Sequence, residues 1–154
     1  MNKDTSSALF KATSDTARNQ ISQAWLATTK LVKMVPQDKV GILQQYTETN
    51  VNFAFKQNFD EKKMACFVEI MHYLMQMIVS EPLTEDKMYD HFKDLLLRHA
   101  VLRPPHSLAI FNLNDVKKID LFVQDTFIRH FDMYSYAFTA KETLLLKTHK
   151  FFER

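Results

Sequence analysis

Six histidines and one cysteine are the residues of this sequence whose types suit metal binding or nucleophilic chemistry. His91 and His99 are eight positions apart, so they share a face if both lie on one helix. No His or carboxylate pair at a spacing of three or four has a matching second pair, which a metal site between helices requires. Cys66 lies beside an apolar stripe and has no recognisable catalytic partner motif, which is typical of a buried, inert thiol.

Acidic residues cluster in the middle of the chain and could serve acid–base catalysis. Their places in and before the first turns of an expected helix explain them equally well, because the helix dipole favours acids there. A single glycine excludes the phosphate-binding loops that need several. The sequence therefore predicts no enzyme, no metal and no cofactor. The cluster comprises Glu81, Glu85, Asp86, Asp90 and Asp94.

Composition limits the class of protein further. The chain has 154 residues, 46% of them hydrophobic, and a formal net charge of +2. This length and apolar content predict one folded domain, and the balanced charge argues against a general nucleic-acid binder. No secretory signal, lipidation signal or apolar run of membrane-spanning length is present. We expect a soluble intracellular protein that binds neither nucleic acid nor membrane.

The apolar residues recur at helical spacing along nearly the whole chain, and no segment alternates as a strand does. The pattern predicts an all-α fold, a compact orthogonal or bundle-like array of about six helices. The expected division is a flexible tail over 1–13, an N-terminal amphipathic helix over 14–35 and a single helical domain over 36–154. The helix boundaries are expected at Ser14, Pro36, Asp60, Thr84, Asn112 or Asn114, and Thr139.

Three elements leave alternatives open. Met64, Met71 and Met75 fit a core stripe, although methionines also line adaptable binding grooves. The basic, amphipathic residues 141–154 suit either packing on their own domain or binding to calmodulin. Gly41 falls inside the second expected helix, where it would mark a close helix–helix contact or a partner contact that an alanine would disturb.

Two segments are unusually rich in residues that favour protein interfaces. The first, which we call the proline segment, is LLLRHAVLRPPHSLAIF over residues 95–111. The second, the aromatic segment, is FIRHFDMYSYAFT over residues 127–139. Aromatic and arginine side chains are frequent at interface hot spots, but the same residues could also form a small core that holds the proline turn.

These two segments, with a looser match at Asn58–Lys63, resemble the CLAMP family of flagellar central-apparatus projection subunits. That family includes cilia- and flagella-associated proteins related to coiled-coil domain-containing protein 189. The resemblance runs from near Pro36 to about Thr143. The family positions that it carries over to this chain are Arg98, His99, Arg103, Pro104, Pro105, Arg129, His130, Tyr134, Tyr136 and Phe138.

The resemblance implies a non-enzymatic structural adaptor of the motile-cilium axoneme, docked on larger scaffold subunits of a central-apparatus projection. Trp25 is a candidate anchor for a neighbour, or else part of its own domain's core. The alternatives are a calmodulin-linked regulatory adaptor and a radial-spoke or doublet-associated axonemal protein. The mildly basic chain ends add tubulin as a candidate partner. We expect residues 1–35 to be removable without unfolding the domain.

Overall fold

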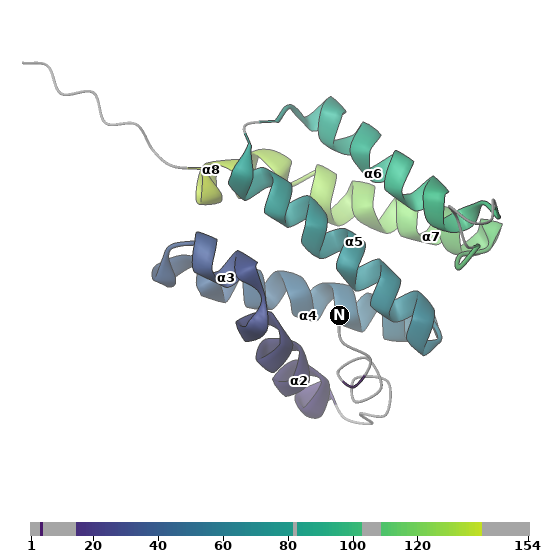
Figure 1. Ribbon diagram of the computed structural model, residues 1–154, viewed down its shortest axis with the longest axis horizontal. Coiled ribbons are helices and arrows are strands. Elements are labelled where there is room, and N and C mark those ends of the chain that lie inside the picture. The colour runs from purple at the N-terminus through teal and green to yellow at the C-terminus, as the bar shows by residue number, and fades with distance from the viewer. Residues whose placement is uncertain (1–3, 5–14, 82, 103–108, 140–154) are drawn as a thin grey trace, which may run out of the picture.

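The computed structural model describes residues 4, 15–81, 83–102 and 109–139 (Figure 1). These residues form helices and short connections, with no strand among them, which confirms the all-α prediction. The elements are α2 (Asp15–Thr28), α3 (Lys30–Met34), the 3-10 turn η1 (Gln37–Lys39), α4 (Val40–Lys56), α5 (Glu61–Ser80), α6 (Glu85–Ala100), α7 (Leu113–Val123), the π-helical segment η2 (Gln124–Ile128) and α8 (Phe131–Phe138).

Side chains at the helix starts explain most of the boundaries. The Asp60 carboxylate accepts from the Lys63 N–H at 2.8 Å and caps α5, as predicted. Asn112, not Asn114, caps α7, because its side-chain oxygen accepts from the Asp115 N–H at 2.8 Å. Thr84 holds the extended backbone of a cap before α6, but its hydroxyl makes no capping hydrogen bond.

The helix predicted over 14–35 is divided at Thr29. The Thr29 hydroxyl and its N–H both donate to the carbonyl of Leu26, at 2.7 and 3.0 Å. Thr28 likewise donates its hydroxyl to the carbonyl of Trp25 at 2.7 Å. Hydroxyl groups that bond to nearby backbone compete with the helical ladder, so the adjacent threonines end α2 and α3 begins in a new direction.

Helix α5 is the centre of the fold, and α4, α6 and α8 all pack against it (Figure 1). Its side chains Met64, Met71 and Met75 are buried, which confirms the core interpretation of these methionines. A stack of Phe53 and Phe122, with ring centroids 3.9 Å apart, lies beside Phe67 of α5. Aromatic rings of α4, α5 and α7 therefore meet in one core.

The N-terminal helices belong to this same core. Trp25, Leu26, Leu31 and Val35 are buried together with side chains of α4 and α5, and α2 packs along α4 (Figure 1). Burial of four large apolar side chains contributes several kcal/mol, at about 1.5–3 kcal/mol for each. The arrangement disfavours our expectation that residues 1–35 can be removed while the domain stays folded.

Gly41 lies in the first turn of α4 and is exposed. A Cβ built there meets no described atom within 4 Å. The predicted helix–helix contact at Gly41 is therefore wrong for the described residues, because α4 turns this position toward open space, whereas a partner contact there stays a prediction.

The helix predicted from Asn112 or Asn114 to Thr139 is divided into several elements in the structure. Helix α7 passes into the π-helical segment η2, and a turn at Arg129 and His130 separates η2 from α8. Thr139 ends α8 in an extended conformation. The tail over 1–13 (except residue 4) and the helix predicted after Thr139 lie outside the described residues.

Candidate interaction surface

The proline segment begins inside α6, and its C-terminal end is hydrogen-bonded to the last turn of that helix. The His99 carbonyl accepts from the N–H groups of Ile110 and Phe111, at 2.7 and 3.2 Å. Phe111 is buried and lies against Phe59, with ring centroids 6.3 Å apart. The last turn of α6 is therefore bonded directly to the residues that precede α7.

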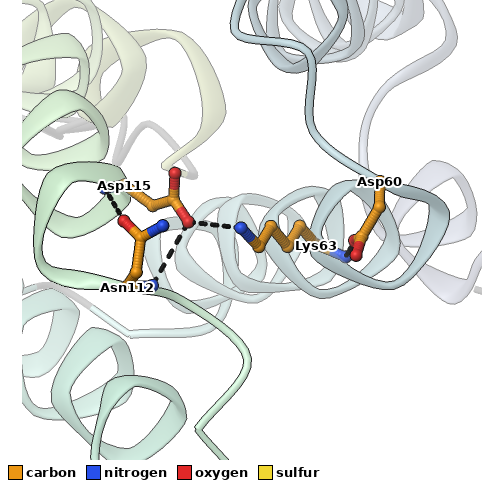
Figure 2. Close-up of polar contacts among 4 residues, drawn as sticks. All are labelled: Asp60, Lys63, Asn112 and Asp115. Carbon is orange, nitrogen blue, oxygen red and sulfur yellow. Dashed lines mark hydrogen bonds and ion pairs between the residues drawn. The ribbon is translucent and has the colours of Figure 1, made fainter.

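A polar network fixes the start of α7 to α5 (Figure 2). One oxygen of the Asp115 carboxylate accepts from the Lys63 Nζ at 2.6 Å and from the Asn112 N–H at 3.2 Å. With the Asn112 side chain bonded to the Asp115 N–H, this is a reciprocal capping box. We call Asp60, Lys63, Asn112 and Asp115 the polar latch.

The ion pair of the latch lies largely out of solvent, since the side chains of Lys63 and Asp115 are 24% and 12% exposed, whereas Asp60 and Asn112 are exposed. An ion pair in this setting is screened less than a surface pair, and its charged hydrogen bonds are stronger than neutral ones. The latch therefore positions the C-terminal end of the proline segment. The sequence predicted Asp60 as a cap and Asn112 as one of two candidate caps. It gave no sign of the contact between Lys63 and Asp115, which joins residues 52 positions apart.

The family positions in the proline segment have local roles where the structure describes them. The Arg98 guanidinium is exposed and lies 2.5 Å from the Asp94 carboxylate, one turn earlier on α6. His99 is half-buried, and its carbonyl holds the segment as described above. Arg103, Pro104 and Pro105 lie outside the described residues.

In the aromatic segment, the buried members form a small core. Phe138 is buried, and Tyr134 contacts the rings of Tyr46 and Phe127 at centroid distances of 5.7 and 5.8 Å. Tyr46 donates its hydroxyl to the Met71 carbonyl at 2.8 Å. Burial raises the pKa of both Tyr46 and Tyr134, so both phenols stay neutral. Tyr136, by contrast, is exposed.

The π-helical segment η2 sets the positions of Arg129 and His130. The Arg129 N–H donates to the Gln124 carbonyl five residues earlier, at 3.1 Å, which is the π-helical pattern. The Arg129 guanidinium pairs with Asp125 at 3.0 Å. The His130 Nδ1 lies 2.8 Å from the Thr126 carbonyl. Because a carbonyl only accepts, Nδ1 carries the hydrogen and donates.

An apolar groove of about 380 Å³ lies between α8, η2 and the first half of α4. Met133 and Ile42 stand on its rim and are 67% and 37% exposed. Lys39 Nζ bonds to the Ala137 carbonyl and ties the start of α4 to the end of α8. We call this feature the α4–α8 groove, and its lining residues are Ile42, Thr126, His130, Met133, Tyr134 and Ala137.

The groove brings His130 and Tyr134 of the aromatic segment together with Ile42, which was not predicted as a site residue. Ile42 belongs to a helix more than eighty positions earlier in the chain. In the sequence, Ile42 is one apolar residue among many and carries no signal of its own. The other family positions are not brought together in this groove.

Trp25 is buried, so it is part of its own domain's core and not an exposed anchor for a neighbour. Its ring meets the edge of His72 of α5, with centroids 5.1 Å apart. Burial lowers the pKa of His72 below its ordinary value of 6.5. A buried indole is not available to a partner, so Trp25 joins α2 to α5.

The other reactive groups that the structure describes are the thiol of Cys66 and scattered His, Asp and Glu side chains. Cys66 is half-buried, and burial raises the pKa of its thiol to about 11, so the thiol stays protonated. Among the residues described, no three His, Cys, Asp or Glu side chains are grouped closely enough to hold a metal ion. None of the helices in these ranges has both the length and the apolar character needed to cross a bilayer.

A family model named CLAMP, described as flagellar C1a complex subunit C1a-32, matches residues 49–146. The match covers more than half of the 154 residues and includes the proline and aromatic segments. The chain belongs to the CLAMP family. The match begins later than the resemblance predicted, so α2, α3, η1 and the first half of α4 lie outside it.

Membership of the CLAMP family assigns the chain a structural role in the axoneme of the cilium or flagellum. The family is described by its place in a complex and not by a reaction. Other axonemal proteins are therefore its partners.

Proposed function

We propose that this CLAMP chain is an adaptor of a central-apparatus projection that docks on a larger scaffold subunit through the α4–α8 groove. The observation that carries this proposal is the exposure of Met133 and Ile42 around an apolar depression. Large apolar side chains at the rim of a concave surface are typical of protein contacts. Family membership supplies the setting, a complex of several subunits.

The groove fits bulky apolar side chains from one helix of the scaffold. Helix-in-groove recognition uses such side chains at spacings of three and four. A volume of about 380 Å³ is at the lower end of the range of binding pockets, so it suits two or three side chains. The Nδ1 of His130 is engaged with Thr126, which leaves Nε2 as the ring's acceptor for a polar group at the rim.

The test compares two sets of variants in motile cilia. Ile42→Ser with Met133→Ser removes the apolar rim, while Tyr73→Ser replaces an exposed aromatic residue on α5 outside the groove. We expect the groove variant to fold with an unchanged melting temperature but to be lost from demembranated axonemes. The Tyr73 variant should be retained as the unaltered protein is. Normal retention of the folded groove variant contradicts the proposal.

Proximity labelling from the incorporated chain gives its axonemal address. Enrichment of central-pair proteins supports the proposed location, whereas enrichment of spoke or doublet proteins supports the alternative.

Residues 141–154, the candidate calmodulin target, lie outside the described part of the chain. Titration of a 139–154 peptide with calmodulin, with and without calcium, tests that role. Salt-sensitive pelleting with microtubules tests tubulin binding.

A further inference from the structure

Helix α7 carries two leucines on the side that faces away from the core. Leu113 and Leu121 are 70% and 63% exposed, and Lys117 lies midway between them. Residues four apart share one face of a helix. At 100° per residue, this face is opposite to the one that buries Ile119 and Val123. We call Leu113, Lys117 and Leu121 the α7 outer stripe.

Two exposed lysines of α7, Lys117 on the stripe and Lys118 beside it, have no ion-pair partner among the described residues. The acidic residues nearby are already engaged. Asp115 pairs with Lys63, Asp120 accepts from Tyr89 and Gln124, and Asp125 pairs with Arg129.

The N-terminal end of the α7 outer stripe is held in place, and other exposed apolar side chains lie near it. The polar latch fixes the first turn of α7, in which Leu113 lies. Leu97 and Leu102, at the end of α6, are exposed as well. The bonds from Ile110 and Phe111 to the His99 carbonyl bring that end of α6 close to the start of α7. A partner there would meet a preformed surface, which lowers the entropy cost of binding.

We propose that the α7 outer stripe binds an acidic amphipathic helix of a partner subunit. The two leucines lie about 12 Å apart along the helix axis, a span that matches apolar side chains on two to three turns of a facing helix. Glu or Asp residues beside that apolar row would pair with Lys117 and Lys118. This is a second docking surface, which does not depend on the α4–α8 groove.

Site-specific photocrosslinking of the full chain in axonemes tests the partner's chemistry. A photoreactive amino acid replaces Leu113 or Leu121, and Ala27, an exposed residue of α2, is the control position. We expect both stripe positions to crosslink to one segment with helical apolar spacing and an excess of Glu and Asp. Crosslinks no stronger than at Ala27 overturn the proposal. So do crosslinks to residues 140–154, to a second copy of the chain, or to a segment without acidic excess.

Charge reversal provides an independent measurement. Lys117→Glu with Lys118→Glu should weaken retention in axonemes roughly two- to tenfold, since two exposed ion pairs are lost and replaced by repulsion. Lys56→Glu with Lys62→Glu makes the same charge change at exposed positions on α4 and α5 and should have no effect. Equal effects of the two double variants contradict the proposal. Normal incorporation of both would remove this second surface and leave the groove proposal standing.

Discussion

Gly41 is the only glycine of the chain, and its position makes a simple stability test. A Cβ there meets no described atom within 4 Å, and alanine is favoured over glycine in helices because it restricts the unfolded chain. Gly41→Ala should raise the free energy of unfolding by about 0.5–1 kcal/mol, measured by urea denaturation. A loss of stability would show that this position makes a contact after all.

His72 makes the stability of the domain dependent on pH. Burial lowers the pKa of His72 in the folded state below its ordinary value of 6.5. At pH values between the folded-state pKa and 6.5, the unfolded chain therefore binds more protons than the folded chain. Stability therefore rises with pH through this window and is lost as the pH falls below about 6.5. Urea denaturation at about pH 7.5 and pH 5.5 should give a lower free energy of unfolding at the lower pH.

The His72→Gln variant is the control for this titration. It should show a smaller difference between the two pH values than the unaltered protein, because glutamine does not titrate. Trp25 is the only tryptophan and contacts the His72 ring, so its fluorescence reports the same protonation. An identical pH dependence in both proteins would assign the effect to other groups.

At the scale of the elements, the polar latch makes a graded prediction. Asp115→Ala removes the ion pair and the reciprocal cap of α7, and should cost about 2 kcal/mol. Lys63→Met leaves the capping box intact and should cost about 1 kcal/mol. In both variants, hydrogen exchange at the Ile110 and Phe111 amides should accelerate, because the latch holds the backbone that donates to His99.

Lys117→Met is the control for the latch, since this exposed lysine of α7 has no ion pair in the described ranges. It should leave the exchange of both amides unchanged. A larger loss in Lys63→Met than in Asp115→Ala would contradict the graded prediction, because it would mean that an unpaired buried carboxylate costs more than losing the ion pair and the cap together.

The elements that were predictable from the sequence are those with local signals. Pro36, Asp60 and Asn112 mark boundaries through their own backbone and side-chain chemistry, and the structure has helix boundaries at or next to each. The division at Thr29 and the π-helical segment were missed, because both depend on how hydroxyl and carbonyl groups bond after the helix forms.

The candidate sites were less predictable, since they join distant positions. His130 and Tyr134 were selected by type, but the groove also needs Ile42 from α4. Likewise, Lys63 finds Asp115 only after α5 and α7 have packed. Leu113 and Leu121 had a usable signal, because a spacing of eight puts them on one face of a helix, away from Ile119.

At the scale of the whole molecule, one core makes the N-terminal helices part of the folding unit. Trp25, Leu26, Leu31 and Val35 share that core with α4 and α5. Removal of residues 1–35 should therefore abolish the cooperative thermal transition or lower its midpoint strongly, as measured by circular dichroism. A truncated chain that melts like the full chain would restore our first expectation of a separable N-terminal helix.

The π-helical segment has a consequence for the shape of the assembled subunit. Residues 113–138 are a nearly continuous helical run that contributes Leu113 and Leu121 at one end and Met133 at the other. An α-helix advances by about 100° for each residue, so a π-helical turn shifts the rotational phase of everything after it. The angle between the two proposed partners therefore depends on the residue count of Gln124–Ile128, together with the turn at Arg129 and His130. We expect loss of one residue there to turn α8, and the partner proposed for it, to a new azimuth around the axis of α7.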